Sequence, residues 1–183
     1  MRGICSLPSL ARGNDMILLS PSECSAWLKN ENCCEAPYRR IGLSAVSYLQ
    51  IAIPKTSGGV SRMVDGIRSC LGSPQTCLFQ ITDWSRYSEL GNSILSELES
   101  RCSGKLQSLE AFGLLFEPDE ADEMFDCCVR VVDCGMSAYL YAPRSATFLL
   151  WEGDLIDVWA NGRELGNRLA QRLESEQFRI TSF

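Results

Sequence analysis

The chain has 183 residues, with a hydrophobic fraction of 45% and a charged fraction of 22%, which is typical of a globular protein that can bury a core without disulfide or metal staples. It contains no histidine, which excludes Ser-His-Asp and Cys-His catalytic arrangements, imidazole bases and zinc sites with a His ligand. The net charge of −6 combines +3 over residues 1–72 with −9 over residues 73–183, so the acidic part disfavours nucleic-acid binding and suits a basic protein partner or no partner.

The N-terminal residues 1–15 lack the continuous apolar segment of a signal peptide. We interpret them as a disordered lead-in to a single α/β domain over residues 16–183. The sequence has no run of about 18 apolar residues, so we expect no transmembrane helix and no membrane partner. These features together favour a cytoplasmic location.

Strand-like and helix-like segments alternate over the first two thirds of the chain. Residues 20–30 predict a short helix with Ser20 or Ser22 as its N-cap. Three apolar runs then predict strands, and each is followed by apolar residues at helical spacing. The strand runs are 47–54, 75–84 and 111–118, and the helical segments are 58–72, 87–102 and 119–134. This alternation predicts parallel strand–helix units.

The pattern changes after residue 136, where strand-like runs follow one another with only short loops between them. Such loops predict antiparallel hairpins, over residues 137–143, 146–153 and 154–160. Residues 161–175 predict a helix with Asn161 as N-cap and Glu164 three positions later, and residues 177–183 predict an edge strand or a tail. The predicted fold class is α/β: a mixed sheet with parallel N-terminal strand–helix units, antiparallel C-terminal hairpins and helices packed on the sheet.

Ten cysteines occur without any Cys-x-x-Cys pair, the usual spacing for a metal or redox site. Cys127 and Cys128 lie on the helical segment 119–134, where apolar residues form one stripe, so we interpret them as core residues rather than ligands. The acids of this segment match no calcium-loop spacing and suit a helix N-terminus. We therefore expect no metal and no cofactor.

A first candidate site combines Lys55, Asp83 and Glu117, which follow the three predicted parallel strands. If these strands are parallel, their carboxyl ends meet at one edge of the sheet, with Ser57, Ser85 and Arg144 nearby. A lysine beside two carboxylates can bind a small polar ligand or tune a general base. The alternative is that Asp83 caps a helix and Glu117 is solvated.

A second candidate is the glycine-rich turn with Lys55, Ser57, Gly58 and Gly59, where backbone amides at a helix start could bind an anion. The lysine precedes the glycines, so the turn is not a phosphate loop. The alternative is an ordinary turn and helix start.

A third candidate is the acidic, aromatic hairpin with Trp151, Glu152, Asp154 and Asp157. Acids around an aromatic anchor can form a docking surface for a basic protein. The alternative is that Trp151 and Trp159 are core residues and the acids are solvated. The function we favour is a non-catalytic protein-binding or regulatory module, of inhibitor or immunity type. The alternative function is a small-ligand-binding protein or enzyme at the sheet edge, and self-association through an open strand edge is compatible with both.

Overall fold

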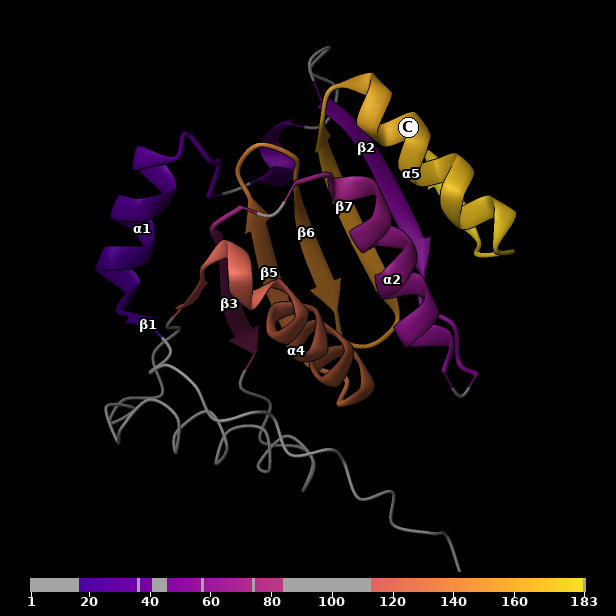
Figure 1. Ribbon diagram of the computed structural model, residues 1–183, viewed down its shortest axis with the longest axis horizontal. Helices are drawn as coiled ribbons and strands as arrows, with labels where there is room; N and C mark the ends of the chain where they lie inside the picture. Colours follow the sequence, from indigo (N-terminus) through magenta and orange to yellow (C-terminus); the bar gives the residue numbers. More distant parts are fainter. Residues whose placement is uncertain are drawn as a thin grey trace, which may run out of the picture.

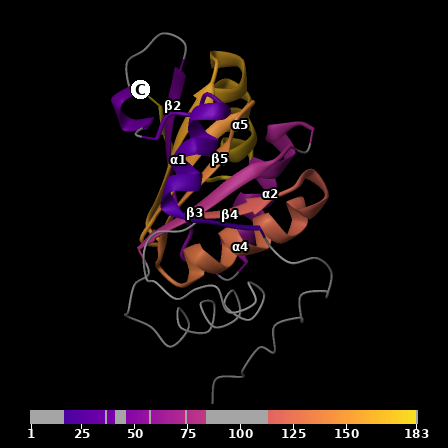
Figure 2. The same ribbon diagram turned by 90° about the vertical axis from the view of Figure 1, so that its left-hand side faces the viewer.

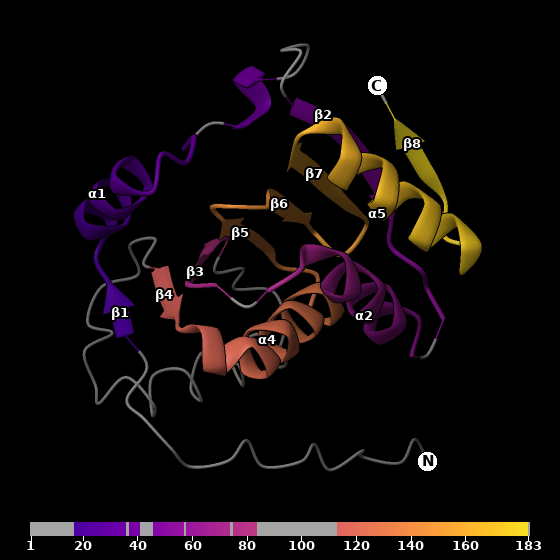
Figure 3. The same ribbon diagram turned by 45° about the horizontal axis from the view of Figure 1, so that its top comes forward.

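The computed structural model describes residues 17–35, 37–40, 46–56, 58–73, 75–83 and 113–182, and these form one eight-stranded sheet with helices on both faces. The strand order is β1-β4-β3-β5-β6-β7-β2-β8, and every neighbouring pair is antiparallel. Figure 3 shows the edge strands β1 and β8 at opposite sides of the sheet. The strands are β1 (Ile17–Leu19), β2 (Val46–Ala52), β3 (Cys77–Asp83), β4 (Gly113–Phe116), β5 (Ser137–Ala142), β6 (Ala146–Trp151), β7 (Leu155–Asn161) and β8 (Ile180–Ser182).

The prediction of parallel strand–helix units is wrong. β2 and β3 do run in the same direction, as the alternation of strand and helix suggested, but three strands separate them. These three are the consecutive C-terminal strands β5, β6 and β7, which form the predicted antiparallel hairpins. Because the hairpins insert between β2 and β3, each of those strands pairs only with antiparallel neighbours. β4, predicted as a third parallel strand, runs antiparallel beside β3.

Three helices cover one face of the sheet, and Figures 1 and 2 show them on the same side. They are α2 (Gly59–Leu71), α4 (Ala121–Asp133) and α5 (Arg163–Ser175). Each is amphipathic, with apolar residues at helical spacing that are buried against the sheet. A fourth helix, α1 (Pro21–Asn30), and the short 3-10 helices η1 (Pro37–Arg40) and η2 (Pro118–Glu120) complete the described elements.

The two faces of the sheet carry different side chains because successive residues of a strand point to opposite sides. On β3, Phe79 belongs to the large core under α2, α4 and α5, whereas its neighbour Leu78 packs with Cys24 and Leu28 of α1 on the other face. We call the first the helix face and the second the open face, since α1 covers only its β3–β5 part. Burying one large apolar side chain contributes about 1.5–3 kcal/mol, so the helix face supplies most of the stability.

The helix ends follow local rules that the sequence partly predicted. Of the two predicted N-caps, Ser20 and Ser22, Ser20 caps α1, and it also forms a capping box with Glu23. Gly135 ends α4 in the left-handed conformation, with the amide of Met136 bonded to the carbonyl of Val131. The prediction of Asn161 as N-cap of α5 is wrong, because the cap residue is Gly162.

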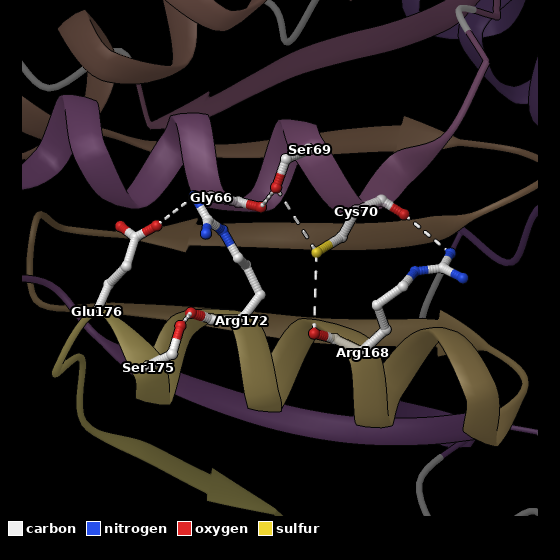
Figure 4. Close-up of polar contacts among 7 residues, drawn as sticks. All are labelled: Gly66, Ser69, Cys70, Arg168, Arg172, Ser175 and Glu176. Atoms are coloured by element: carbon white, nitrogen blue, oxygen red, sulfur yellow. Dashed lines mark hydrogen bonds and ion pairs between the residues drawn. The ribbon is translucent and has the colours of Figure 1, made fainter.

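Helices α2 and α5 lie close together because a glycine of α2 faces a bulky side chain of α5. A Cβ atom added at Gly66 would lie only 2.9 Å from Leu173 Cδ2. Polar contacts follow the same seam, as Figure 4 shows. Arg168 donates to the carbonyl of Cys70 at 3.0 Å, and Arg172 forms an ion pair with Glu176, the C-cap residue of α5. The seam is therefore a structural contact that fixes two of the three helices on the sheet.

Several predictions fall outside the described residues. These are the lead-in 1–15 and the helical segment 87–102. The strand β1 was not predicted, because its three residues follow the lead-in without an alternating pattern. The last predicted segment does form an edge strand, β8, next to β2.

Candidate functional site

The three residues of the first candidate site do not converge. Lys55 follows β2 and Asp83 ends β3 at the same edge of the sheet, but β5, β6 and β7 lie between them. Four strand spacings separate the two strands by roughly 19 Å. Glu117 follows β4, which runs the opposite way, so it lies at the other edge, where it accepts a hydrogen bond from Thr76 at 3.0 Å. Arg144 is also at that far edge, where its amide donates to Gln75 at 2.9 Å, and Ser57 and Ser85 lie outside the described residues.

The glycine-rich turn has a structural reason for its composition. Gly58 adopts the left-handed conformation with φ of 71° and precedes α2, and a Cβ atom at Gly59 would lie 2.6 Å from Thr56 Oγ1. The ammonium group of Lys55 lies 2.6 Å from Asp154 and donates to the carbonyl of Gly153 at 2.8 Å. The positive charge predicted for an anion site is therefore held by the turn between β6 and β7.

That turn gives the acidic hairpin a defined shape. The amide of Asp154 donates to the carbonyl of Trp151 at 2.9 Å, and the two central residues both have positive φ, 46° at Glu152 and 70° at Gly153. These are the marks of a type I′ turn, which matches the twist of two antiparallel strands. A Cβ atom at Gly153 would lie 2.9 Å from the carbonyl oxygen of Val132, so the turn packs directly on the end of α4.

The two tryptophans of the hairpin have different environments. Trp151, at the end of β6, is 50% exposed, whereas Trp159 on β7 is only 3% exposed. Trp159 packs beside Tyr48, with ring centroids 5.5 Å apart, and its indole nitrogen has no hydrogen-bond acceptor among the described residues. The interpretation of both tryptophans as core residues therefore holds for Trp159 alone.

The three acids of the hairpin also differ. Glu152 is exposed and has no ion-pair partner in the described part of the chain. Asp154 is paired with Lys55. Asp157 lies on the open face and accepts hydrogen bonds from Tyr48 at 2.8 Å and Gln50 at 3.0 Å. Burial, together with the hydrogen bond to Asp157, raises the pKa of Tyr48 to about 12, so this phenol stays a donor at neutral pH.

These residues form one continuous patch at the edge of the open face. Trp151 pairs with Leu155 across β6 and β7, and Asp157 is the next residue of β7 on the same face. Glu152 and Asp154 belong to the turn beyond them. We name this patch, formed by Trp151, Glu152, Asp154, Leu155 and Asp157, the Trp151 surface.

A pocket of ≈ 200 Å³ lies at the opposite end of the open face, and sequence reasoning missed it. It forms where the end of α1 meets the turn after β5 and the end of β7. Its lining includes Asn32, which follows α1, and Thr147 and Asn161, which belong to β6 and β7. No sequence pattern joins these residues, since more than a hundred positions separate them and only the tertiary fold brings them together.

The described cysteines do not gather with other ligand side chains into a metal site. Among the described residues, eight cysteines are thiols, and no group of three or more His, Cys, Asp or Glu could hold a metal ion. Cys127 and Cys128 are buried, which confirms their interpretation as core residues. Burial raises the pKa of Cys128 and raises the pKa of Cys77 to about 12, so both thiols are protonated and poor nucleophiles at neutral pH.

None of the helices in the described ranges combines the length and apolar character needed to span a bilayer. Comparison with known proteins finds no matching family model, no matching curated protein and no matching solved structure.

Proposed function

We propose that the protein is a non-catalytic binding module that docks a basic protein through the Trp151 surface. The observation that carries this proposal is the half-exposed indole of Trp151, placed beside the carboxylates of Glu152 and Asp157 by a tight turn. A regulatory or inhibitor role follows from this kind of site, because it offers contact area and charge. The eight cysteine thiols of the described residues are typical of a reducing compartment, which supports a cytoplasmic location.

Trp151 has the properties of an interface anchor. Of the large apolar side chains in the described ranges, only Ile17, Tyr38 and Trp151 are strongly exposed. Tryptophan is enriched among the residues that dominate binding energy, since its large rigid ring buries much area at little entropic cost. The backbone at Trp151 is also held in place, because the next residues form the type I′ turn that packs on the end of α4.

The charge around Trp151 points to the chemistry of the partner. Glu152 has no ion-pair partner among the described residues, and Asp157 is held in place by two neutral donors, so both keep their negative charge available. A positively charged partner is attracted at a distance and meets unneutralised carboxylates on contact. The excess of acids in residues 73–183 extends this attraction beyond the contact itself.

Strain in the turn is a second argument for a binding role. Glu152 adopts a left-handed conformation that asparagine or glycine would adopt at lower energy. Residues held in unfavourable conformations cluster at functional sites, where the side chain has a use that compensates for the strain. At this position Glu152 supplies a negative charge beside Trp151.

The alternative function, a ligand site or enzyme built from Lys55, Asp83 and Glu117, has less support. It requires three converging side chains, and Glu117 lies at the opposite edge from the other two positions. Lys55 already pairs with Asp154. We therefore favour the binding module.

The proposal is tested by placing a photo-crosslinking amino acid at position 151 in the full-length protein in its own cells. The expected result is a covalent adduct with a basic protein, identified by mass spectrometry. The matched control is the same amino acid at Ile17, which is 45% exposed at the far edge strand β1. An adduct formed equally from position 17, or none from position 151, would contradict the proposal.

Once the partner is identified, its affinity is measured for the Trp151→Ala variant. We expect a loss of about 2 kcal/mol or more, close to thirtyfold in Kd. The Glu152→Lys variant should lower the association rate, and the effect should shrink as salt is added. Glu174→Lys is the control, because Glu174 is also exposed but lies on α5.

A further inference from the structure

The pocket at the far end of the open face contains polar groups that no described residue satisfies. Thr147 lies in its wall and is only 7% exposed, yet its hydroxyl forms no hydrogen bond with any described residue. The hydroxyl of Thr147 is therefore a group that a ligand in this pocket would satisfy.

Asn161 is a second wall residue whose orientation is fixed. Its amide nitrogen donates to the carbonyl of Pro143 at 2.9 Å, which leaves its side-chain oxygen as a free acceptor. Pro143 itself lines the pocket, so this hydrogen bond lies within its wall. The free groups contributed by the two strands, the hydroxyl of Thr147 and the oxygen of Asn161, both accept hydrogen bonds.

The charge of the pocket comes from α1. Among the described residues that line it, only Glu31 carries a formal charge, and this exposed carboxylate stands at the C-cap of the helix. The next residue, Asn32, has φ of 56° and turns the chain over the pocket in a Schellman motif, with the amide of Cys33 bonded to the carbonyl of Leu28 at 2.8 Å. The turn thereby adds a negative charge to a pocket whose wall also contains Thr147 and Asn161.

We propose that this pocket binds a small organic cation, an alkylguanidinium or alkylammonium group, through the acceptors of Glu31, Thr147 and Asn161. Such a group carries several N–H donors and a positive charge, which complement three acceptors of which one is anionic. The volume of ≈ 200 Å³ lies below the range of about 300–1,000 Å³ usual for drug-sized ligands, so the group is small. It can belong to a free metabolite or to the end of a protein side chain.

The test is an NMR titration of the full-length protein with methylguanidinium and, separately, with methylammonium. We expect saturable millimolar binding that shifts the side-chain amide signals of Asn32 and Asn161. The indole N–H signal of Trp159, which is directly opposite Thr147 in the sheet, serves as an additional reporter. Trp159 does not line the pocket, so its shift should be smaller. Acetate and urea are the controls for charge and for hydrogen bonding.

Two conservative variants distinguish the pocket from unspecific ion binding. Thr147→Val keeps the shape of a buried side chain and should weaken binding about tenfold through loss of one hydrogen bond to a charged group. Glu31→Gln alters only an exposed residue and should weaken it about fivefold. Glu174→Gln, a similarly exposed change on α5, should leave the affinity unchanged.

A third probe, a blocked Gly-Arg-Gly tripeptide, distinguishes the two possible sources of the cation, a protein side chain and a free metabolite. Binding equal to that of methylguanidinium indicates an arginine side chain of a protein, and binding of the free ions alone indicates a metabolite. Either result supports the cation site. Equal shifts with acetate, no saturable shift with either cation, or unchanged affinity in both Thr147→Val and Glu31→Gln would overturn it.

Discussion

The two faces of the sheet have opposite compositions although the same strands supply both. On the helix face, β6 and β7 present Phe148, Leu150, Ile156 and Val158, all buried under helices. On the open face the same strands present Thr147, Trp151, Asp157 and Trp159, which combine aromatic rings with polar groups. The comparison teaches that the helix face is core throughout, whereas the open face buries Thr147 and Trp159 but exposes Trp151 at its end, where it can carry recognition.

Both proposed sites lie on the open face, at its two ends. Thr147 and Trp151 are four residues apart on β6 and point to the same side, which places them about 14 Å apart. The Trp151 surface is an exposed patch suited to a macromolecule, whereas the pocket takes a small group. A basic protein of modest size could therefore reach both, and the tripeptide arm of the titration asks whether the second contact exists.

The largest expected effect is a difference in stability between two variants, each of which truncates one aromatic residue on one face of the sheet. Phe148→Ala removes a ring that is fully buried in the helix-face core and should cost about 3–5 kcal/mol of unfolding free energy. Trp151→Ala removes a half-exposed ring of the same strand and should cost less than about 1 kcal/mol. Urea denaturation of both variants measures this. Equal losses would mean that Trp151 is a stability residue and would weaken the docking proposal.

A smaller effect is expected on the pH dependence of stability, through the hydrogen bonds of Tyr48 and Gln50 to Asp157 on the open face. The pKa of Tyr48 is raised in the folded state to about 12, mainly by burial and then by its bond to Asp157. A folded-state pKa above the ordinary value of about 10 means that the protonated phenol stabilises the fold. This contribution is complete below pH 10 and is lost as the pH rises through 12.

Denaturation at a series of alkaline pH values checks this sign. The wild type should lose more stability than Tyr48→Phe between pH 10 and 12, while at neutral pH the variant should be less stable by about 1 kcal/mol through loss of one hydrogen bond. Tyr139 and Tyr141, whose pKa values burial also raises, remain in both proteins and cancel from the difference. Identical alkaline profiles would show that the pKa of Tyr48 is not raised in the folded protein, which would contradict both its burial and its bond to Asp157.

The sequence predicted segments better than it predicted how they pair. The helices, the hairpins of β5–β7 and the edge strand β8 follow from local periodicity and turn residues, which act over a few positions. The direction of β4 and the insertion of β5–β7 between β2 and β3 depend on contacts between distant segments, and an apolar run such as that of β4 fits either direction. The error in pairing placed Glu117 at the wrong edge and so produced a site that does not assemble.

The candidate sites show the same limit. The hairpin around Trp151 is local, so its residues could be found from the sequence, although nothing in the pattern separates the exposed Trp151 from the buried Trp159. Both lie at alternate positions that point to the open face, and their different burial depends on the neighbours of each ring, such as Tyr48 beside Trp159. The pocket, which joins residue 31 to residue 161, has no local signal at all.

The smallest expected effect is a gain in stability at two residues that share a left-handed backbone conformation. Only one of the two lies on the proposed binding surface. Glu152 and Gln177 both have positive φ, 46° and 67°, the first in the β6–β7 turn and the second at the end of α5. Asparagine tolerates this conformation better than either, so Glu152→Asn and Gln177→Asn should each stabilise the protein by about 0.5–1 kcal/mol in urea denaturation.

Glu152→Asn and Gln177→Asn should have similar stabilities but different affinities for the basic partner. If the charge of Glu152 contributes to docking, Glu152→Asn weakens association with the basic partner, and Glu152→Gln, which removes the charge without the gain in turn stability, weakens it equally. Gln177→Asn should bind as the wild type does, because Gln177 is far along the chain from the Trp151 surface and follows a helix of the other face. A stabilised Glu152→Asn that binds unchanged would mean that the strained acid is not used in recognition, and Trp151 would then be the only anchor of the surface.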